Sequence, residues 1–169
     1  MKNMKPYKMT ESDHNKLKAY GADRGFEFVE SRSVPEVLML PSRKTKYSAG
    51  YDFMCPFTTV ILPGDEAKIY TRVKAFMMRD EYLELHMRSS MAINHGLVLK
   101  NCTGIIDSDY YNNPENEGEI IAVVRNTGED PVTIEAGTNF IQGIFCKYLI
   151  VAGDDPREKR VGGIGSTGK

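Results

Sequence analysis

Two carboxylates and two phenols follow a short apolar run in the segment Gly104-Ile-Ile-Asp-Ser-Asp-Tyr-Tyr111. If this segment is extended, Asp107 and Asp109 share one side of a strand, because side chains two residues apart point to the same face. One carboxylate could then activate a water molecule as a general base, and the ring of Tyr110 could face a flat ligand. A polar turn that closes a hairpin is the alternative interpretation.

Residues suited to anions stand at two other places in the chain. Arg88, Ser89 and Ser90 come at the start of a short helix expected over 89–95, where unpaired amides and the helix dipole favour an anion. Ser89 as a simple N-cap is the alternative. The last nine residues, 161–169, combine four glycines with two hydroxyl side chains, a set of donors that could wrap a phosphate chain. A disordered Gly-Ser terminus is the alternative there.

Two more side chains have both a chemical and a structural interpretation. Asp52 follows the small-residue turn Ser48-Ala-Gly50, and it could orient water around a magnesium ion or tie down that turn. Asn101 follows a strand expected over 96–100, and its amide could recognise a base edge or close a hairpin.

The elements that must position these residues are mostly short strands. Apolar residues alternate with polar ones around 26–28, 83–87 and 132–134, and a long apolar strand is expected over 140–151. Turn signals recur between these runs, which favours an all-β sandwich or barrel. Helices are expected over 10–20 and over 89–95, the second ended by Gly96.

Composition excludes several classes of function. The 169 residues fit one domain, and a net charge of −1 implies no general affinity for nucleic acid or for a membrane surface. No apolar run approaches the length of a membrane span. Cys55, Cys102 and Cys146 are odd in number and widely spaced, so we expect core or strand thiols in a reducing cytoplasm rather than disulfides or a zinc site.

Five ordered segments of the chain resemble the motifs of the trimeric dUTP pyrophosphatases (dUTPases). They are Ala49-Gly-Tyr-Asp-Phe53, Arg88-Ser-Ser90, Gly104-Ile-Ile-Asp-Ser-Asp-Tyr110, the stretch from Gly137 to Phe145 with Gln142, and Gly162-Gly-Ile-Gly-Ser-Thr-Gly168. The resemblance implies a jelly-roll-like β-barrel with one short helix and a homotrimer whose three active sites are shared between subunits. It divides the chain into a polar N-terminal extension (1–24), the barrel (25–152) and a mobile C-terminal arm (153–169) that closes the active site.

The resemblance also implies a role for each matching residue. Asp107 would activate the water that attacks the α-phosphorus of dUTP, and an ordinary carboxylate pKa would keep it ionised at neutral pH. Tyr110 would pack on the deoxyribose. Asp52 would act through water on Mg²⁺, which would bridge the triphosphate oxygens. The substrate-binding residues implied as a group are Arg88, Ser89, Ser90, Asn101, Gly104, Ile105, Ile106, Tyr110, Ile121, Gln142, Arg160, Ile164, Gly165, Ser166 and Thr167.

The chain departs from the family pattern at several positions. Ile164 stands where many members have a Phe that stacks on uracil, and Tyr111 is a candidate to replace that ring. Asn139 replaces an Arg of the fourth motif, which questions a structural ion pair there. The insertion 112–117 should lengthen a hairpin loop near the base pocket.

The implied activity is hydrolysis of dUTP to dUMP and pyrophosphate, which keeps uracil out of DNA and supplies dUMP for dTMP synthesis. The implied setting is the cytoplasm of a bacterium, with a bacterial or phage gene. A dCTP-deaminating relative of the same fold is one alternative, because those enzymes also carry Arg-Ser-Ser. A regulatory protein that binds a repressor through 112–117 or 1–24 is another, although solvent-exposed decoration is the favoured interpretation of both segments.

Overall fold

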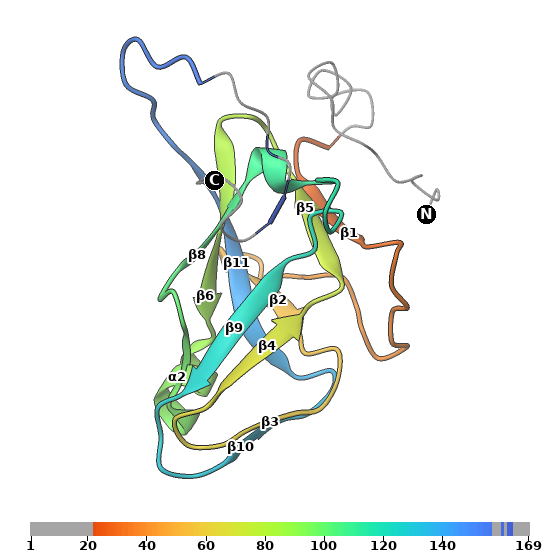
Figure 1. The fold of residues 1–169 in the computed structure, drawn as a ribbon, viewed down its shortest axis with the longest axis vertical. Helices are drawn as coiled ribbons and strands as arrows, with labels where there is room; N and C mark the ends of the chain where they lie inside the picture. The colour runs from red at the N-terminus through yellow and green to blue at the C-terminus, as the bar shows by residue number, and fades with distance from the viewer. Residues whose placement is uncertain (1–21, 157–159, 161, 164–169) are drawn as a thin grey trace.

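The computed structural model describes residues 22–156, 160, 162 and 163, and this part of the chain is built mostly from short strands (Figure 1). The strands are β1 (Gly25–Phe28), β2 (Tyr51–Met54), β3 (Thr59–Ile61), β4 (Glu66–Tyr70), β5 (Val73–Phe76), β6 (Glu81–Met87), β7 (Leu97–Leu99), β8 (Gly104–Asp107), β9 (Ile121–Asn126), β10 (Val132–Ile134) and β11 (Asn139–Lys147). The α-helix α2 (Ser89–His95) and the 3₁₀ turn η2 (Ser108–Tyr110) interrupt them. The predicted all-β class with one short helix is confirmed, whereas the helix expected over 10–20 lies outside the described residues.

The strands form four antiparallel groups. The largest sheet has the order β2-β11-β6-β8, a second has the order β4-β9-β7, and two ribbons pair β1 with β5 and β10 with β3. In Figure 1, α2 lies with the β3–β10 ribbon at one end of the molecule, and the β1–β5 ribbon lies toward the other end. The long central strands β6 and β11 therefore connect the two ends.

Alternation along these strands separates an apolar core from a polar sheet face. Phe53, Leu83, Leu85 and Ile141 are at most 2% exposed and belong to the main core cluster. Most of their strand neighbours point the other way, because successive side chains of a strand alternate between faces. The exception is Phe140 beside Ile141, where the register of β11 shifts and both side chains are buried. Gln142 lies opposite Asp52 on β2 and opposite His86 on β6, so polar groups from three strands share the outer face of the largest sheet.

Three local predictions can be compared directly with the structure. Helix α2 covers the predicted residues, and Gly96 ends it in the left-handed conformation with φ of 64°. The strand predicted over 140–151 is wrong at its end, because the last paired residue of β11 is Lys147, opposite Glu81. The apolar residues that follow have no strand beside them among the described residues, and Leu149 is 98% exposed.

The three cysteines occupy different environments. Cys55 is buried after β2, and Cys146 lies in β11, as expected for core and strand thiols. The same expectation is wrong for Cys102, which is exposed in the turn after β7 with φ of 61°. Within the described residues, no helix is long and apolar enough to cross a membrane.

Candidate active site at the end of β8

Asp107 is the last residue of β8, and it shares a cation with Asp109. The guanidinium of Arg160 donates from Nε to Asp109 Oδ1 at 2.8 Å and from Nη2 to Asp107 Oδ2. Both carboxylates are about half exposed, whereas the Arg160 side chain is 13% exposed. The prediction that the two carboxylates share one side of a strand is wrong, because Ser108–Tyr110 turn into η2. They converge nonetheless, since the arm places Arg160 between them.

Partial burial changes the titration of Asp107. Loss of solvent raises the pKa of this carboxyl above its ordinary value, and the nearby charge of Asp109 raises it further, while the Arg160 cation opposes both. The prediction of an ordinary carboxylate pKa therefore needs correction. A raised pKa makes the ionised carboxylate a stronger acceptor for a proton from water, which is what a general base requires.

Tyr110 is held rigidly beside these carboxylates. It is 7% exposed, its hydroxyl donates to the carbonyl of Glu119 at 2.9 Å, and the side chain of Asn116 donates to it at 2.8 Å. The Arg160 guanidinium carbon lies 5.8 Å from the ring centroid. The bond to Glu119 draws the chain after Asp107 inward, which gives a physical reason for η2 in place of continued strand.

Arg88 lies at the other end of β6, where it is oriented by Asp52. Its Nε lies 3.1 Å from Asp52 Oδ1, and its Nη1 donates to the carbonyl of Asn139 at 3.2 Å. Asp52 is 9% exposed, so this carboxylate neutralises the cation in a partly dry environment. The side chain of Asn139 cannot supply a charge, but its backbone carbonyl still helps to hold the Arg88 guanidinium.

Ser89 and Ser90 are exposed in the first turn of α2. The interpretation of Ser89 as the N-cap is wrong: Arg88 is the N-cap residue, and no side chain in the described part of the chain caps the helix. Arg88 is held in an extended conformation because its amide donates to Phe140 on β11. The helix start therefore leaves both serine hydroxyls toward solvent.

Gln142 on β11 completes this polar group. A Cβ placed on Gly50 would lie 2.2 Å from Gln142 Oε1, so the amide of Gln142 occupies the space above a glycine. The glycine of the first motif thus has a steric role: it admits the side chain of the fourth motif next to Asp52.

The predicted base-reading residues lie on the turn and strand after β7. Asn101 is exposed in the turn, and its carbonyl accepts from the Thr103 amide at 2.6 Å. Gly104 is buried, Ile105 is 53% exposed, and Ile106 is half-buried on β8. Ile121 opens β9 opposite Tyr70. A cavity of about 640 Å³ lies next to this turn, lined by residues that include Met87, Ala92, Val98, Lys100 and Cys102.

Within one chain, the sheet register separates the predicted phosphate-binding residues around Gln142 from the predicted catalytic residue Asp107. Asp107 pairs with Tyr82 on β6, whereas Gln142 pairs with His86 four residues farther along the same strand. At about 3.3 Å per residue, that offset corresponds to about 13 Å along β6. One chain therefore brings together Arg88, Asp52 and Gln142 at one end, and Asp107, Tyr110 and Arg160 at the other.

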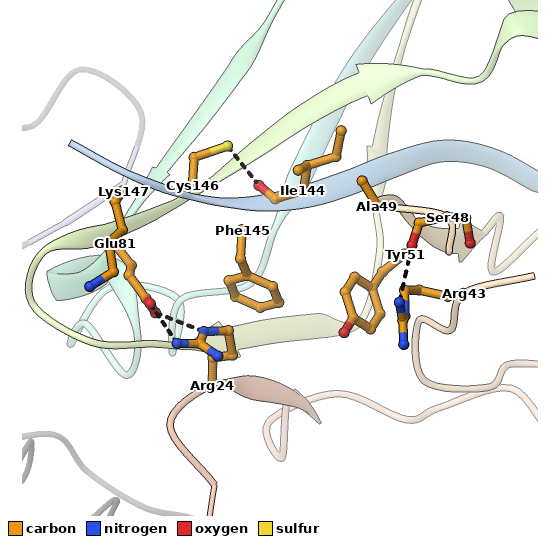
Figure 2. Close-up of a pocket in the computed structure, with 10 residues that line it drawn as sticks. All are labelled: Arg24, Arg43, Ser48, Ala49, Tyr51, Glu81, Ile144, Phe145, Cys146 and Lys147. Carbon is orange, nitrogen blue, oxygen red and sulfur yellow. Dashed lines mark hydrogen bonds and ion pairs between the residues drawn. The ribbon is translucent and has the colours of Figure 1, made fainter. Parts of the chain in front are cut away.

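A second cavity, of about 320 Å³, lies between β11 and the N-terminal segment and contains no predicted site residue (Figure 2). Its cations are already engaged. Arg24 donates to Glu81 at 2.6 and 3.0 Å, Arg43 donates to the Ser48 carbonyl, and Lys147 donates to Asp80. The rings of Tyr51 and Phe145 stand between these groups (Figure 2). This cavity fits a structural contact between elements better than a ligand site.

Among the described residues, no group of three or more His, Cys, Asp or Glu side chains could hold a metal ion. The predicted arm residues Ile164, Gly165, Ser166 and Thr167 lie outside the described residues. Sequence reasoning missed Glu115 and Asn116, which contact the arm and Tyr110. The sequence showed that both residues belong to the insertion 112–117. No local pattern indicated that their side chains contact Tyr110 and Gly163.

Comparison with known proteins extends the resemblance along most of the chain. The sequence model of the dUTPase family matches residues 37–168. A deoxyuridine 5′-triphosphate nucleotidohydrolase of Lactococcus lactis is 44% identical over 147 residues, which cover 86% of this chain and 97% of that protein. The crystal structure of a dUTPase from Streptococcus mutans is 43% identical, with a TM-score of 0.70 over 76% of this chain and 99% of the other.

A dUTPase from phage phi11 of S. aureus is similar in fold alone. It is 20% identical, with a TM-score of 0.63 over 80% of this chain and 96% of the other.

Proposed function

The chain belongs to the dUTPase family, and we propose that it hydrolyses dUTP to dUMP and pyrophosphate in the cytoplasm. The observation that carries this proposal is the 44% identity to a named dUTP nucleotidohydrolase across 97% of that protein. The reaction lowers dUTP, which keeps uracil out of DNA, and it supplies dUMP for dTMP synthesis.

Asp107 is the proposed general base. Its ionised carboxylate takes a proton from water, and the water oxygen forms a bond to the α-phosphorus. The bond between that phosphorus and the bridging oxygen breaks, and pyrophosphate leaves with the bonding pair. The half-exposed position of Asp107 at the end of β8 supports this role, because water and substrate can reach it.

Arg88, Ser89, Ser90 and Gln142 are proposed to bind the phosphates. The serine hydroxyls are exposed at the start of α2, and Asp52 holds the Arg88 guanidinium in one orientation. A fixed, planar guanidinium binds phosphate oxygens through two parallel hydrogen bonds. Asn101 with the backbone of 104–106 is proposed to pair with uracil, and Tyr110 to pack on the sugar.

Magnesium is the proposed cofactor, carried largely by the substrate. Mg²⁺ commonly binds through one or two carboxylates, water and substrate phosphates rather than in an all-protein cage. The described residues fit that mode, since Asp52 is a single carboxylate paired with the proposed phosphate ligand Arg88, and they contain no cluster of three acidic, His or Cys side chains that could hold a metal ion. When bound, the ion would neutralise charge on the triphosphate.

A homotrimer with shared active sites is proposed as the functional unit. The separation of about 13 Å along β6 between the two halves supports it, because the α-phosphorus must meet both halves at once. The exposed apolar run Tyr148–Val151 supplies surface that a second copy could bury.

Complementation tests the shared site. Refolding a mixture of an Arg88→Ala and an Asp107→Asn variant should restore activity that neither variant has alone. Activity that stays at the level of the two separate variants would place both halves of a site in one chain.

The function itself is tested with purified chain, MgCl₂ and one nucleotide at a time. We expect dUTP to give dUMP and pyrophosphate in equal amounts, with far slower turnover of UTP and dCTP. Release of ammonia from dCTP would instead identify a deaminase, and no product from dUTP would contradict the proposal.

A further inference from the structure

The loop 112–117 is folded inward at Asn113, whereas Pro114 and Glu115 are exposed. Asn113 is 4% exposed, and its amide nitrogen donates to the Tyr110 carbonyl at 2.9 Å and to Asn116 Oδ1 at 2.7 Å. The expectation of a solvent-exposed loop is therefore wrong for Asn113. We propose that this loop is a positioning device: Asn116 sets the Tyr110 ring, and Glu115 holds the C-terminal arm through Gly163.

The loop backbone is closed in one shape. The Asn112 amide donates to the Glu117 carbonyl at 3.0 Å, and Asn112 and Glu117 both have positive φ, at 53° and 59°. A Cβ on Gly118 would lie 2.5 Å from the Tyr110 carbonyl oxygen, so only glycine fits there. Non-glycine residues keep such conformations only where the surroundings determine them strongly, and they concentrate at functional sites.

The buried cation of Lys74 on β5 binds the loop at Asn112. Lys74 on β5 is 2% exposed, and its Nζ donates to Asn112 Oδ1 at 2.7 Å. The carboxylates of Glu27 and Glu117 each lie 3.9 Å from the same nitrogen. A buried ammonium requires such partners, because leaving it unpaired is strongly destabilising. The anchor fixes both ends of the loop to the β1–β5 ribbon.

From this base, Asn116 reaches Tyr110. Its Nδ2 donates to the phenol oxygen at 2.8 Å, and its Oδ1 accepts from the Gly118 amide at 3.1 Å. The phenol oxygen therefore donates to Glu119 and accepts from Asn116, which leaves the ring a single orientation. A ring that packs on a sugar discriminates best between deoxyribose and ribose when it cannot move away from the added 2′-hydroxyl.

Glu115 makes the second contact, to the arm. Its Oε2 accepts from the Gly163 amide at 2.6 Å, and Gly163 is buried. A Cβ on Gly163 would lie 3.5 Å from the Tyr110 hydroxyl and 3.6 Å from Asn116 Nδ2, so the arm passes directly over the loop. The inference rests on the proposed hydrolysis of dUTP and adds the residues that hold Tyr110 and the arm in place for it.

The contact to Tyr110 is tested by Asn116→Asp in a double-mutant cycle with Tyr110→Phe. The carboxylate keeps the acceptor for Gly118 but cannot donate to the phenol, so the fold should persist. We expect Asn116→Asp to lower kcat/KM for dUTP about tenfold and to reduce the dUTP/UTP preference. In the Tyr110→Phe background, the same change should add almost nothing. Full additivity of the two changes would overturn this part of the inference.

The contact to the arm is tested by Glu115→Ala, with Glu115→Gln as the matched variant that keeps an acceptor oxygen. We expect Glu115→Ala to lower kcat/KM for dUTP about tenfold while the affinity for dUMP, which lacks the outer phosphates, stays unchanged. Glu115→Gln should recover most of the loss. An equal fall in dUMP affinity, or no change in either quantity, would overturn the role in holding the arm.

Wild-type protein assayed in parallel separates the two levels of inference. Absence of dUTP hydrolysis by the wild type would contradict the proposed function itself. Normal wild-type turnover with unaffected Asn116→Asp and Glu115→Ala variants would contradict only the positioning role of the loop.

Discussion

Arg160 lies between Asp107 and Asp109 and donates to both, to Asp109 at 2.8 Å through Nε and to Asp107 through Nη2. Its guanidinium opposes the raised pKa of Asp107, since burial and the charge of Asp109 both act in the other direction. Through Arg160, the C-terminal segment thus influences the ionisation of the proposed base.

Asp109→Asn should shift the pH dependence of hydrolysis. The charge of Asp109 raises the pKa of Asp107, so its removal lowers that pKa and leaves the base ionised at lower pH. The acid limb of the kcat/KM profile should therefore move to lower pH. Titration of dUTP itself is common to both enzymes and cancels in the comparison. An acid limb that stays in place, or moves upward, would show that Asp107 does not set it.

Arg160→Gln should move the same limb in the opposite direction. Loss of the cation removes a contribution that lowers the pKa of Asp107, so more alkaline solution is needed to ionise the base. Arg160→Lys retains the positive charge without the planar guanidinium that donates to both carboxylates, and it serves as the matched control. The control should keep the limb closer to its wild-type position. Equal shifts in both variants would point to geometry rather than charge.

Asp52→Asn should leave the Arg88 guanidinium less firmly held in its orientation. The ion pair at 3.1 Å is lost, while the Asn139 carbonyl remains as a partner, so the fold is retained and KM for dUTP rises about tenfold. Titration with MgCl₂ separates the two roles of Asp52. An unchanged magnesium dependence fits a residue that acts through Arg88. A large rise in the magnesium concentration required would favour the role through metal-bound water.

Gly50→Ala should displace Gln142. The added methyl group would lie 2.2 Å from Gln142 Oε1, and the flexible amide can move aside at little cost in stability. We expect a nearly unchanged melting temperature together with a raised KM for dUTP. Gly64→Ala is an instructive contrast, because that glycine has open space around it but a φ of 79°. It should lower the melting temperature with little effect on KM.

Local signals allowed much of the fold to be predicted. The helix over 89–95 and its glycine stop depend on neighbours in the sequence, and so does the alternation along β6. The end of β11 did not follow from its own residues, because it is set by where β6 begins at Glu81. Apolar composition alone could not distinguish a paired strand from the exposed run after Lys147.

Motifs in the sequence indicated candidate site residues but not the contacts between them. Asp52, Arg88 and Gln142 were recognised from motifs, yet their grouping follows from strand register. The burial of Asn113 in the loop 112–117 was not predicted, because the shape of the loop depends on distant partners such as Lys74, a buried cation on β5 that binds Asn112. Long-range partners of this kind leave no pattern in the loop itself.

The most direct test of the proposed mechanism is a single-turnover measurement with Asp107→Asn. Excess enzyme is mixed with labelled dUTP and MgCl₂, and binding and product formation are followed separately. The amide still fits the site but cannot accept a proton from water, so dUTP should bind normally while dUMP forms at least about a hundredfold more slowly. Formation of dUMP at the wild-type rate would show that Asp107 is not the base.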